Sequence, residues 1–222
     1  MNHEAPLVSG TLWVRYGKRP FDLIVASALL LVLSPALLAT AALVKLTSPG
    51  TVFFTQERGG RSGATFRLVK FRTMRGDRRP DPKELVPLNH ADITPLGRFL
   101  RRSKIDELPQ LFNVLTGSMS LIGPRPTLPD QVAAYDEFRR LRLRLRPGIT
   151  GLAQVNGHAL ASWEERILYD LAYVRRCGFW MDQGILLRTL LVMLLGEERT
   201  TRPFASTKYA KYVTPPPGYG VD

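Results

Sequence analysis

An uncharged apolar run near the N-terminus constrains the fold of this 222-residue chain more than any other feature. From Leu23 to Val44 the sequence reads LIVASALLLVLSPALLATAALV, which is 22 residues without a charged side chain. A helix of that length can span the hydrocarbon core of a bilayer. The chain is therefore predicted to carry a membrane-associated segment ahead of a soluble part.

The Ser34-Pro35 pair at the centre of this run bears on how the segment sits in a membrane. An interior proline removes a helix hydrogen bond and kinks the helix. Lys18-Arg19 and Lys45 place positive charge at both ends, so neither end is preferred for crossing. We favour a re-entrant hairpin with both ends on the cytoplasmic side, each half being about 11 residues or roughly 16 Å long. A spanning helix that tolerates the proline, and a signal peptide cleaved near Ala39-Thr-Ala41, are the alternatives.

The charge balance predicts an anionic partner. Lys and Arg number 31 against 19 Asp and Glu, a formal net charge of +12. Nucleic acid, a membrane surface and a phosphorylated substrate all fit such an excess. Arginine supplies most of the positive charge and suits bidentate phosphate binding. The single cysteine, Cys177, excludes an internal disulfide and is compatible with a reducing compartment.

The histidines indicate no Cys/His metal site, because His3, His90 and His158 lie far apart in the sequence. Any metal is expected to be a hard ion with oxygen ligands.

Two strands are predicted after the apolar run. Val52–Thr55 is short and β-prone, and Ala64–Met74 alternates as a strand does. The intervening Glu57–Gly63 reads as a glycine-rich turn without the P-loop pattern, so it predicts no nucleotide binding by itself. Gly76–Ala91 is polar and rich in proline, and we expect a loop there.

Helices are predicted beyond this loop. The first covers Ile93–Ile105 and is entered at Thr94-Pro95, and a second begins near Pro109 and stops before Gly117. A capping box, Ser162-x-x-Glu165, opens a third helix.

A fourth helix is predicted from near Asp182 to Leu195. The last two helices suit a membrane interface and equally suit the cover of an ordinary core. The basic segment 139–146 (RRLRLRLR) fits a strand or an interfacial helix, and the tail after Arg202 is expected to be extended or disordered.

One acidic pair, Asp106-Glu107, falls at the junction of the first two of these helices. Many cations surround it in the sequence: Arg98, Arg101, Arg102, Lys104 and Arg125. Positive charge lowers a carboxylate pKa, so both acids are expected to be ionised at neutral pH. The same cations would attract phosphate, and a carboxylate beside a bound phosphate is a candidate nucleophile. The alternative is a solvated, charged helix end.

Several motifs in a fixed order give the chain a resemblance to a known family. It resembles bacterial sugar transferases of the monotopic phosphoglycosyl transferase family, in their compact catalytic form, from about Arg15 to Leu195. The motifs are Lys18-Arg-Pro-Phe-Asp22, Ser34-Pro35, Gln56-x-Arg58-x-Gly60, Lys70-Phe-Arg-Thr-Met74, Asp106-Glu-Leu-Pro-Gln110, Gly123-Pro-Arg-Pro126, Pro147-Gly-Ile-Thr-Gly151 and Gln154-Val-Asn-Gly157.

The resemblance implies a reaction and a place for it. Such enzymes move a sugar 1-phosphate from a UDP-sugar to a polyprenol phosphate, here expected to be undecaprenyl phosphate, and release UMP. This is the first membrane step of a bacterial glycan pathway such as exopolysaccharide, capsule, O-antigen or glycoprotein assembly. It takes place at the cytoplasmic face of the inner membrane, without nucleic acid, and a homodimer is left open.

The family's catalytic pair corresponds to Asp106 and Glu107. Asp106 would form a covalent phosphosugar intermediate, and both acids are assigned to Mg²⁺, with Glu107 binding it or orienting the site. Their division of labour is not fixed by the sequence. Arg125 is the predicted phosphate clamp. Lys70, Arg72, Gln154 and Asn156 are further substrate-binding candidates, while Ser34 and Pro35 would break the hairpin.

The expected fold is α/β and helix-rich. It comprises an N-terminal segment (1–17), a re-entrant membrane hairpin (18–46), a cytosolic catalytic domain with interfacial amphipathic helices (47–201) and a flexible tail (202–222). The chain departs from its relatives at Ser118, where many carry an acid, and at Lys104-Ile105, where small polar residues are usual. A basic, membrane-anchored binding protein for anionic lipid or nucleic acid is the alternative function.

Overall fold

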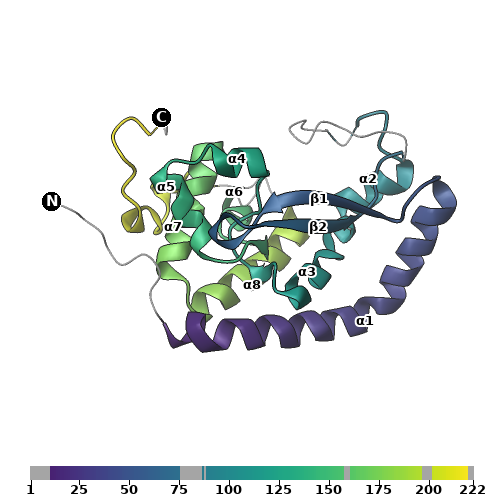
Figure 1. The fold of residues 1–222 in the computed structure, drawn as a ribbon, viewed down its shortest axis with the longest axis horizontal. Helices are drawn as coiled ribbons and strands as arrows, with labels where there is room; N and C mark the ends of the chain where they lie inside the picture. The colour runs from purple at the N-terminus through teal and green to yellow at the C-terminus, as the bar shows by residue number, and fades with distance from the viewer. Residues whose placement is uncertain (1–10, 76–86, 88, 158–160, 197–201, 220–222) are drawn as a thin grey trace.

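The structure is a computed structural model that describes residues 11–75, 87, 89–157, 161–196 and 202–219. A π-helical turn, Trp13–Gly17, leads into the long helix α1 (Lys18–Thr47), which lies along one side of a small α/β domain (Figure 1). The other elements are, in chain order, β1 (Phe53–Gly59), a 3-10 turn (Arg61–Gly63), β2 (Thr65–Phe71), α2 (Pro95–Arg102), a 3-10 turn (Ile105–Glu107), α3 (Gln110–Thr116), β3 (Ser120–Ile122), α4 (Pro129–Ala133), α5 (Glu137–Arg140), a 3-10 turn (Leu141–Arg144), β4 (Gly148–Thr150), α6 (Gln154–Gly157), α7 (Trp163–Arg176), α8 (Phe179–Leu195) and two 3-10 turns (Phe204–Ser206, Ala210–Tyr212). The predicted helix-rich α/β class is confirmed.

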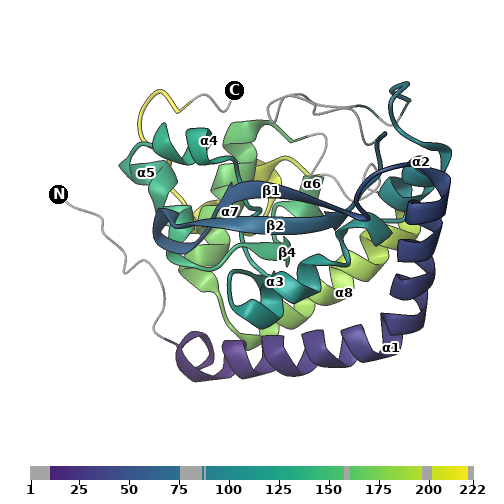
Figure 2. The ribbon, with the colours of Figure 1, turned by 45° about the vertical axis from the view of Figure 1, so that its right-hand side comes forward.

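Helix α1 is continuous but bent. It runs straight along the domain and then turns, as Figure 2 shows. Pro35 lies inside it, and the hydroxyl of Ser34 donates to the carbonyl oxygen of Leu31 at 2.8 Å. A missing backbone donor at proline explains such a bend. The segment Trp13–Thr47 is long and apolar enough to cross a membrane, and only 11% of its most apolar window is buried in the protein.

Polar contacts fix the start of α1 to the domain. The ammonium of Lys18 pairs with buried Asp182 of α8 at 2.8 Å, and Asp22 accepts a hydrogen bond from the amide of Leu121 in β3. Arg19 donates to the last carbonyls of α3, those of Val114 and Leu115. Buried ion pairs and satisfied helix ends resist movement, so this apolar helix has a defined orientation relative to the domain.

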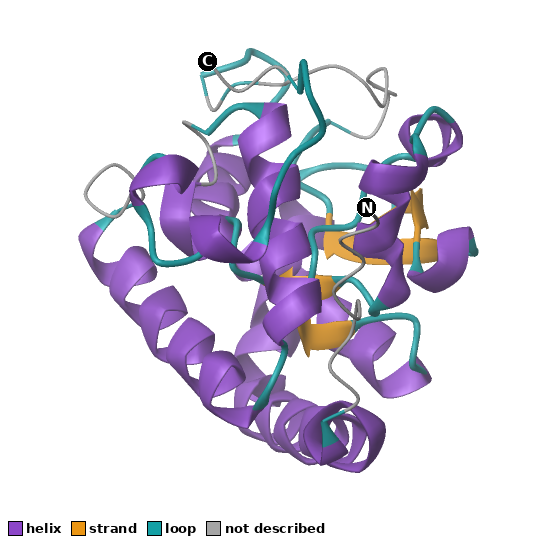
Figure 3. Ribbon diagram, turned by 90° about the vertical axis from the view of Figure 1, so that its left-hand side faces the viewer, coloured by secondary structure: helices purple, strands orange, loops and turns teal. Residues whose placement is uncertain are grey.

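Two small sheets organise the interior, with helices on both sides of the strands (Figure 3). β1 and β2 form an antiparallel hairpin, and β3 and β4 form a parallel pair. Backbones meet closely beyond β3. A side-chain carbon at Gly123 would lie 2.3 Å from the carbonyl oxygen of Arg146, and one at Gly148 would lie 2.1 Å from the amide nitrogen of Gly123. Only glycine permits this approach, which fixes the Gly-Pro-Arg-Pro turn against β4.

Helix α7 is the centre of the hydrophobic core. Tyr169 and Tyr173 are fully buried, and the predicted capping box is confirmed, since the Ser162 hydroxyl accepts from the amide of Glu165. The C-terminal end of α8, by contrast, lies outside the hydrophobic core, since Leu194 is 81% exposed. Exposed apolar side chains also cover much of α1, so the molecule presents a large apolar surface of the kind that marks an interaction or membrane site.

Two segments left open or expected to be flexible have defined conformations. The basic segment 139–146 is helical over residues 139–144, which contain the end of α5 and the following 3-10 turn, and becomes extended at Leu145. Residues 202–219 are packed instead of forming a free tail: Phe204, Val213 and Tyr219 are buried in the main core. The reason lies in aromatic contacts, since Phe204 stacks edge-on against Tyr169 with ring centroids 4.9 Å apart.

Candidate active site

The acidic pair lies on the 3-10 turn between α2 and α3. The predicted start of α2 is confirmed, since the Thr94 hydroxyl accepts from the amide of Gly97. After α2, Lys104 adopts a left-handed conformation with φ 59° and reverses the chain. A non-glycine residue in this region stores strain of a kind that clusters at functional sites. The reversal leaves Asp106 buried and Glu107 partly exposed.

Asp106 does not behave as the basic neighbourhood in the sequence predicts. Its side chain is only 7% exposed, and its Oδ1 atom is buried without a hydrogen-bond partner in the part of the chain that the structure describes. Burial, followed by the charge of Glu107, raises its pKa to about 6, against the opposing effect of Lys70 and Arg101. The expectation that cations lower both pKa values is therefore wrong for Asp106, because desolvation outweighs them.

The nearby cations Lys70 and Arg125 pair with Glu107 instead. Burial by itself would raise its pKa, but Lys70 and Arg125 hold that pKa well below the usual range. The Lys70 ammonium lies 2.6 Å from Oε1 of Glu107, and Nη2 of Arg125 lies 3.5 Å from the same oxygen. The ionised form is thus destabilised at Asp106 and stabilised at Glu107. Separation of this kind is the usual sign of divided roles in a catalytic pair.

Arg58 is a further cation at this site, and in the sequence it stands out only as a member of the Gln56-x-Arg58-x-Gly60 motif. It lies near the end of β1, and burial together with the neighbouring Arg125 lowers its pKa to about 10. The amide of Gly59 donates to the carbonyl oxygen of Thr127 at 2.8 Å, which ties β1 to the turn that carries Arg125. The side-chain alternation of β1 could have pointed to Arg58, but its approach to Arg125 depends on a contact between segments 67 residues apart in the chain.

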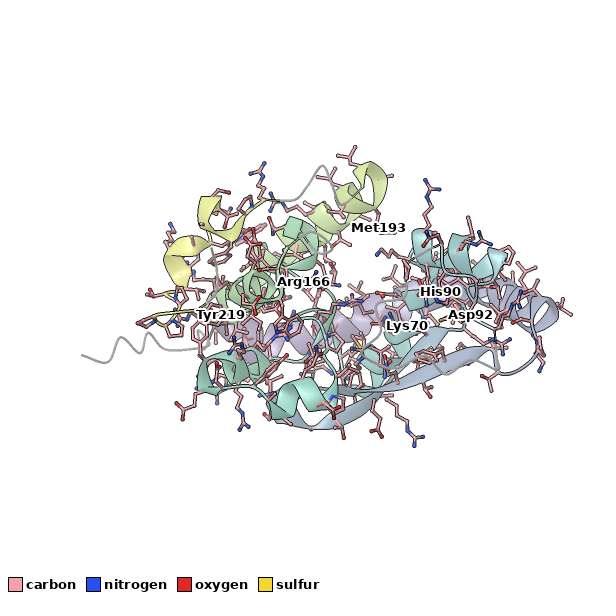
Figure 4. The ribbon with its side chains drawn as sticks, turned by 90° about the horizontal axis from the view of Figure 1, so that it is seen from above. Lys70, His90, Asp92, Arg166, Met193 and Tyr219 are labelled. Carbon is pink, nitrogen blue, oxygen red and sulfur yellow. The ribbon has the colours of Figure 1, made fainter. Side chains whose placement is uncertain are left out.

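Two hollows near the acidic pair share Arg58, Arg125 and Pro126 in their walls. The smaller hollow is also lined by Lys70 and Gln110. The larger one is a cavity of about 100 Å³. The cavity is lined by Arg58, Arg125, Pro126, Thr127, Gln131, Arg142, Ala153, Gln154, Trp163, Arg166 and Asp170. Figure 4 labels Lys70, which lines the smaller hollow, and Arg166, which lines the cavity; both lie near the middle of the domain.

The remaining sequence candidates separate into two groups. Gln154 lies in the cavity wall, with its amide nitrogen donating to the carbonyl oxygen of Ile149. Asn156 is buried outside it, where it accepts from Arg188 of α8. Arg72 directly follows β2, and its guanidinium reaches the C-terminal end of α1. There it donates to the backbone carbonyl and the hydroxyl of Ser48 at 2.7 and 2.8 Å. Arg72 and Asn156 thus hold elements together, whereas Gln154 faces the hollow.

The carboxylates offer a limited metal site. Within the described ranges no group of three or more His, Cys, Asp and Glu side chains could hold an ion. Asp106 still has an orphaned carboxylate oxygen beside Glu107, and Mg²⁺ commonly takes one or two carboxylates together with substrate phosphate oxygens. The donor set therefore fits Mg²⁺ bound jointly with a phosphorylated substrate better than a preformed cage.

Comparison with known proteins gives a consistent result. A family model described as bacterial sugar transferase matches residues 13–196. The uncharacterized sugar transferase EpsL of Bacillus subtilis (strain 168) is 44% identical over 180 residues, which are 81% of this chain and 88% of that protein. A UDP-glucose:undecaprenyl-phosphate glucose-1-phosphate transferase of Klebsiella pneumoniae is 42% identical over 181 residues, 78% of this chain and 39% of that protein.

A UDP-N-acetylgalactosamine-undecaprenyl-phosphate N-acetylgalactosaminephosphotransferase of Aeromonas hydrophila is 40% identical over 185 residues, 81% of this chain and 44% of that protein. The chain thus spans most of the Bacillus relative but less than half of the length of the other two.

Proposed function

Because this chain belongs to the bacterial sugar transferase family, we propose that it transfers a sugar 1-phosphate from a UDP-sugar to a polyprenol phosphate and releases UMP. The observation that carries the proposal is the buried carboxylate of Asp106, which has a free oxygen beside the cations held by Glu107. Undecaprenyl phosphate is the expected acceptor.

The proposed reaction has two steps with Asp106 as nucleophile. A carboxylate oxygen of Asp106 attacks the sugar-linked phosphorus, the bond from that phosphorus to the bridging oxygen breaks, and UMP leaves with the bridging oxygen. A phosphate oxygen of the polyprenol phosphate then attacks the same phosphorus and releases the free carboxylate. Each step exchanges one P–O bond for another. The raised pKa of Asp106 makes its carboxylate more basic, while a value of about 6 leaves most of it ionised at neutral pH.

The cations supply the electrostatic part of catalysis. Phosphoryl transfer depends mainly on positioning and on neutralising charge at the phosphate oxygens. Lys70, Arg58 and Arg125 line the smaller hollow. Glu107 pairs with Lys70 and Arg125 and so holds both cations at the acidic pair. We therefore assign Glu107 a positioning role.

Mg²⁺ is the proposed cofactor. Asp106 and Glu107 would hold it together with phosphate oxygens of the donor. When bound, the ion would supply further charge neutralisation on the transferring phosphate.

The proposed membrane arrangement is monotopic, with the active site at the cytoplasmic face of the inner membrane. Its support is the bend in α1 with Pro35 inside the helix, and the exposed apolar side chains of α1 and α8. Leu31 and Leu38, on either side of Pro35, are 77% and 71% exposed. A re-entrant segment would return both ends to the side where a lipid phosphate can meet the acidic pair.

Release of UMP tests the proposed function. The protein in lipid nanodiscs is incubated with UDP-glucose or UDP-N-acetylgalactosamine and undecaprenyl phosphate, and UMP is measured. We expect release with at least one UDP-sugar, its near-complete loss in Asp106→Asn, and normal release in the matched control Asp130→Asn on exposed helix α4. Equal activity of Asp106→Asn and the control would reject this chemistry.

A further inference from the structure

The cavity beyond Arg58 and Arg125 contains polar atoms that the described protein leaves unpaired. Oε1 of Gln154 and Oδ1 of Asp170 are buried acceptors without a hydrogen-bond partner within the described ranges. Nε of Arg58 and Nε of Arg142 are buried donors in the same condition. All four residues line this one cavity. Buried unpaired polar groups are costly, so their convergence on one space indicates a ligand that brings both donors and acceptors.

The acceptor of Gln154 is fixed by its neighbour. The side-chain nitrogen of Gln154 donates to the carbonyl oxygen of Ile149 at 2.7 Å. A carbonyl can only accept, so the nitrogen faces Ile149 and the amide oxygen is left for the cavity.

Asp170 is held in a similar way. Oδ2 of Asp170 accepts a hydrogen bond from the guanidinium of Arg142. Arg142 also donates to the hydroxyl of Tyr135 and to the backbone carbonyl of Arg125. Arg142 is only 2% exposed, so this network is a fixed cavity wall rather than a mobile surface cluster.

In-line phosphoryl transfer decides which half of the donor enters this cavity. The attacking and leaving oxygens lie on opposite sides of the transferring phosphorus. Lys70, which pairs with Glu107 beside Asp106, lines the smaller hollow but not the cavity, whereas Arg58 and Arg125 line both. The leaving group therefore points toward the cavity, with its phosphate at the two arginines.

We propose that this cavity binds the uridine of the leaving UMP, with Gln154 Oε1 accepting from the ring N–H of uracil and Asp170 Oδ1 accepting from ribose hydroxyls. The inference rests on the proposed function for the direction of the donor. Trp163 supplies an aromatic wall, and its ring already lies 5.4 Å from the guanidinium carbon of Arg142. Uracil offers the N–H donor that the amide oxygen requires, whereas cytosine presents a lone pair at the same ring position.

Nucleotide affinity tests this assignment without turnover. Dissociation constants of UMP, CMP and glucose 1-phosphate are measured for the full chain in nanodiscs and for Gln154→Met, which keeps the side-chain length but removes the acceptor together with the donor to Ile149. Gln183→Met in α8 is the matched control, because its amide nitrogen is also buried without a partner in the described structure but does not line the cavity. Covalent labelling at saturating UDP-sugar reports separately whether each variant still performs the first step.

We expect the unchanged protein to bind UMP at least about tenfold more tightly than CMP. Gln154→Met should weaken UMP binding about three- to tenfold, reduce the preference over CMP, and leave glucose 1-phosphate and the Gln183→Met control unaffected. A loss confined to glucose 1-phosphate would overturn the assignment by placing the sugar in the cavity, and unchanged affinities would overturn it as a binding site. If UMP behaves as expected while no UDP-sugar labels the unchanged protein, the uridine site stands and the proposed transfer reaction fails.

Discussion

Replacing the buried carboxylate of Asp106 should make the protein more stable while abolishing its proposed chemistry. Burial and Glu107 raise the pKa of Asp106 from 3.8 to about 6. The unfolded chain ionises near the lower value, so between about pH 4 and pH 6 the folded protein holds a proton that the unfolded chain has lost. Above pH 6 the folded state carries a penalty from the ionised group. A shift of roughly two pKa units corresponds to at most about 3 kcal/mol.

The variant Asp106→Asn removes this penalty and keeps the shape of the side chain. At pH 7 we expect its free energy of unfolding to exceed that of the unchanged protein by about 1–3 kcal/mol, and its melting temperature to rise. The difference should shrink as the pH falls and vanish near pH 4, where Asp106 is protonated in the folded protein. Melting temperatures of the detergent-solubilised proteins at about pH 4 and pH 7 measure it. Equal or lower stability of Asp106→Asn at pH 7 would refute the claim that burial strains this carboxylate.

Three further predictions concern ionisation, backbone strain and topology. At limiting UDP-sugar the rate of covalent labelling should rise with pH through a midpoint of about 6, the pKa of Asp106. Lys70→Met should move this midpoint to higher pH, because Lys70 lowers the pKa of Asp106. A rate that does not depend on pH would contradict this prediction. The backbone of Lys104 has a φ of 59°, which glycine adopts easily and a β-branched residue does not. Lys104→Gly should therefore keep the free energy of unfolding or raise it by up to about 1 kcal/mol, and Lys104→Val should lower it by about 1–3 kcal/mol. Similar melting temperatures of the two variants would disprove backbone strain at this position. Cysteines replacing the exposed residues Leu12 and Thr51, one on each side of α1, should react with a membrane-impermeant reagent from the same side of a sealed vesicle, since native Cys177 is buried; labelling from opposite sides would show a spanning helix.

Local sequence signals predicted the helix starts well. Thr94-Pro95 before α2 and Ser162 with Glu165 before α7 form the expected caps. These succeed because a cap depends on residues three or four positions apart, which the sequence displays directly. The position of the acidic pair between two helices follows from the same signals.

Long-range contacts explain what the sequence could not predict about the site. The cations around Asp106-Glu107 suggested one common effect, but Lys70 and Arg125 come from other elements and both meet Glu107. Burial of Asp106 depends on the turn at Lys104 and on packing that no local pattern records. Gln154 and Asn156 lie two residues apart and looked equivalent, yet only Gln154 faces the cavity. Packing of the segment after Arg202 likewise depends on a distant aromatic partner, Tyr169.

The central claim is that Asp106 carries the sugar phosphate during transfer, and mass spectrometry of the protein incubated with UDP-sugar alone tests it most directly. We expect a sugar-phosphate adduct on the peptide that contains Asp106, absent from Asp106→Asn and discharged when undecaprenyl phosphate is added. UMP release that requires the acceptor from the outset, with no adduct on this peptide at any time, would contradict the claim and indicate a single direct displacement.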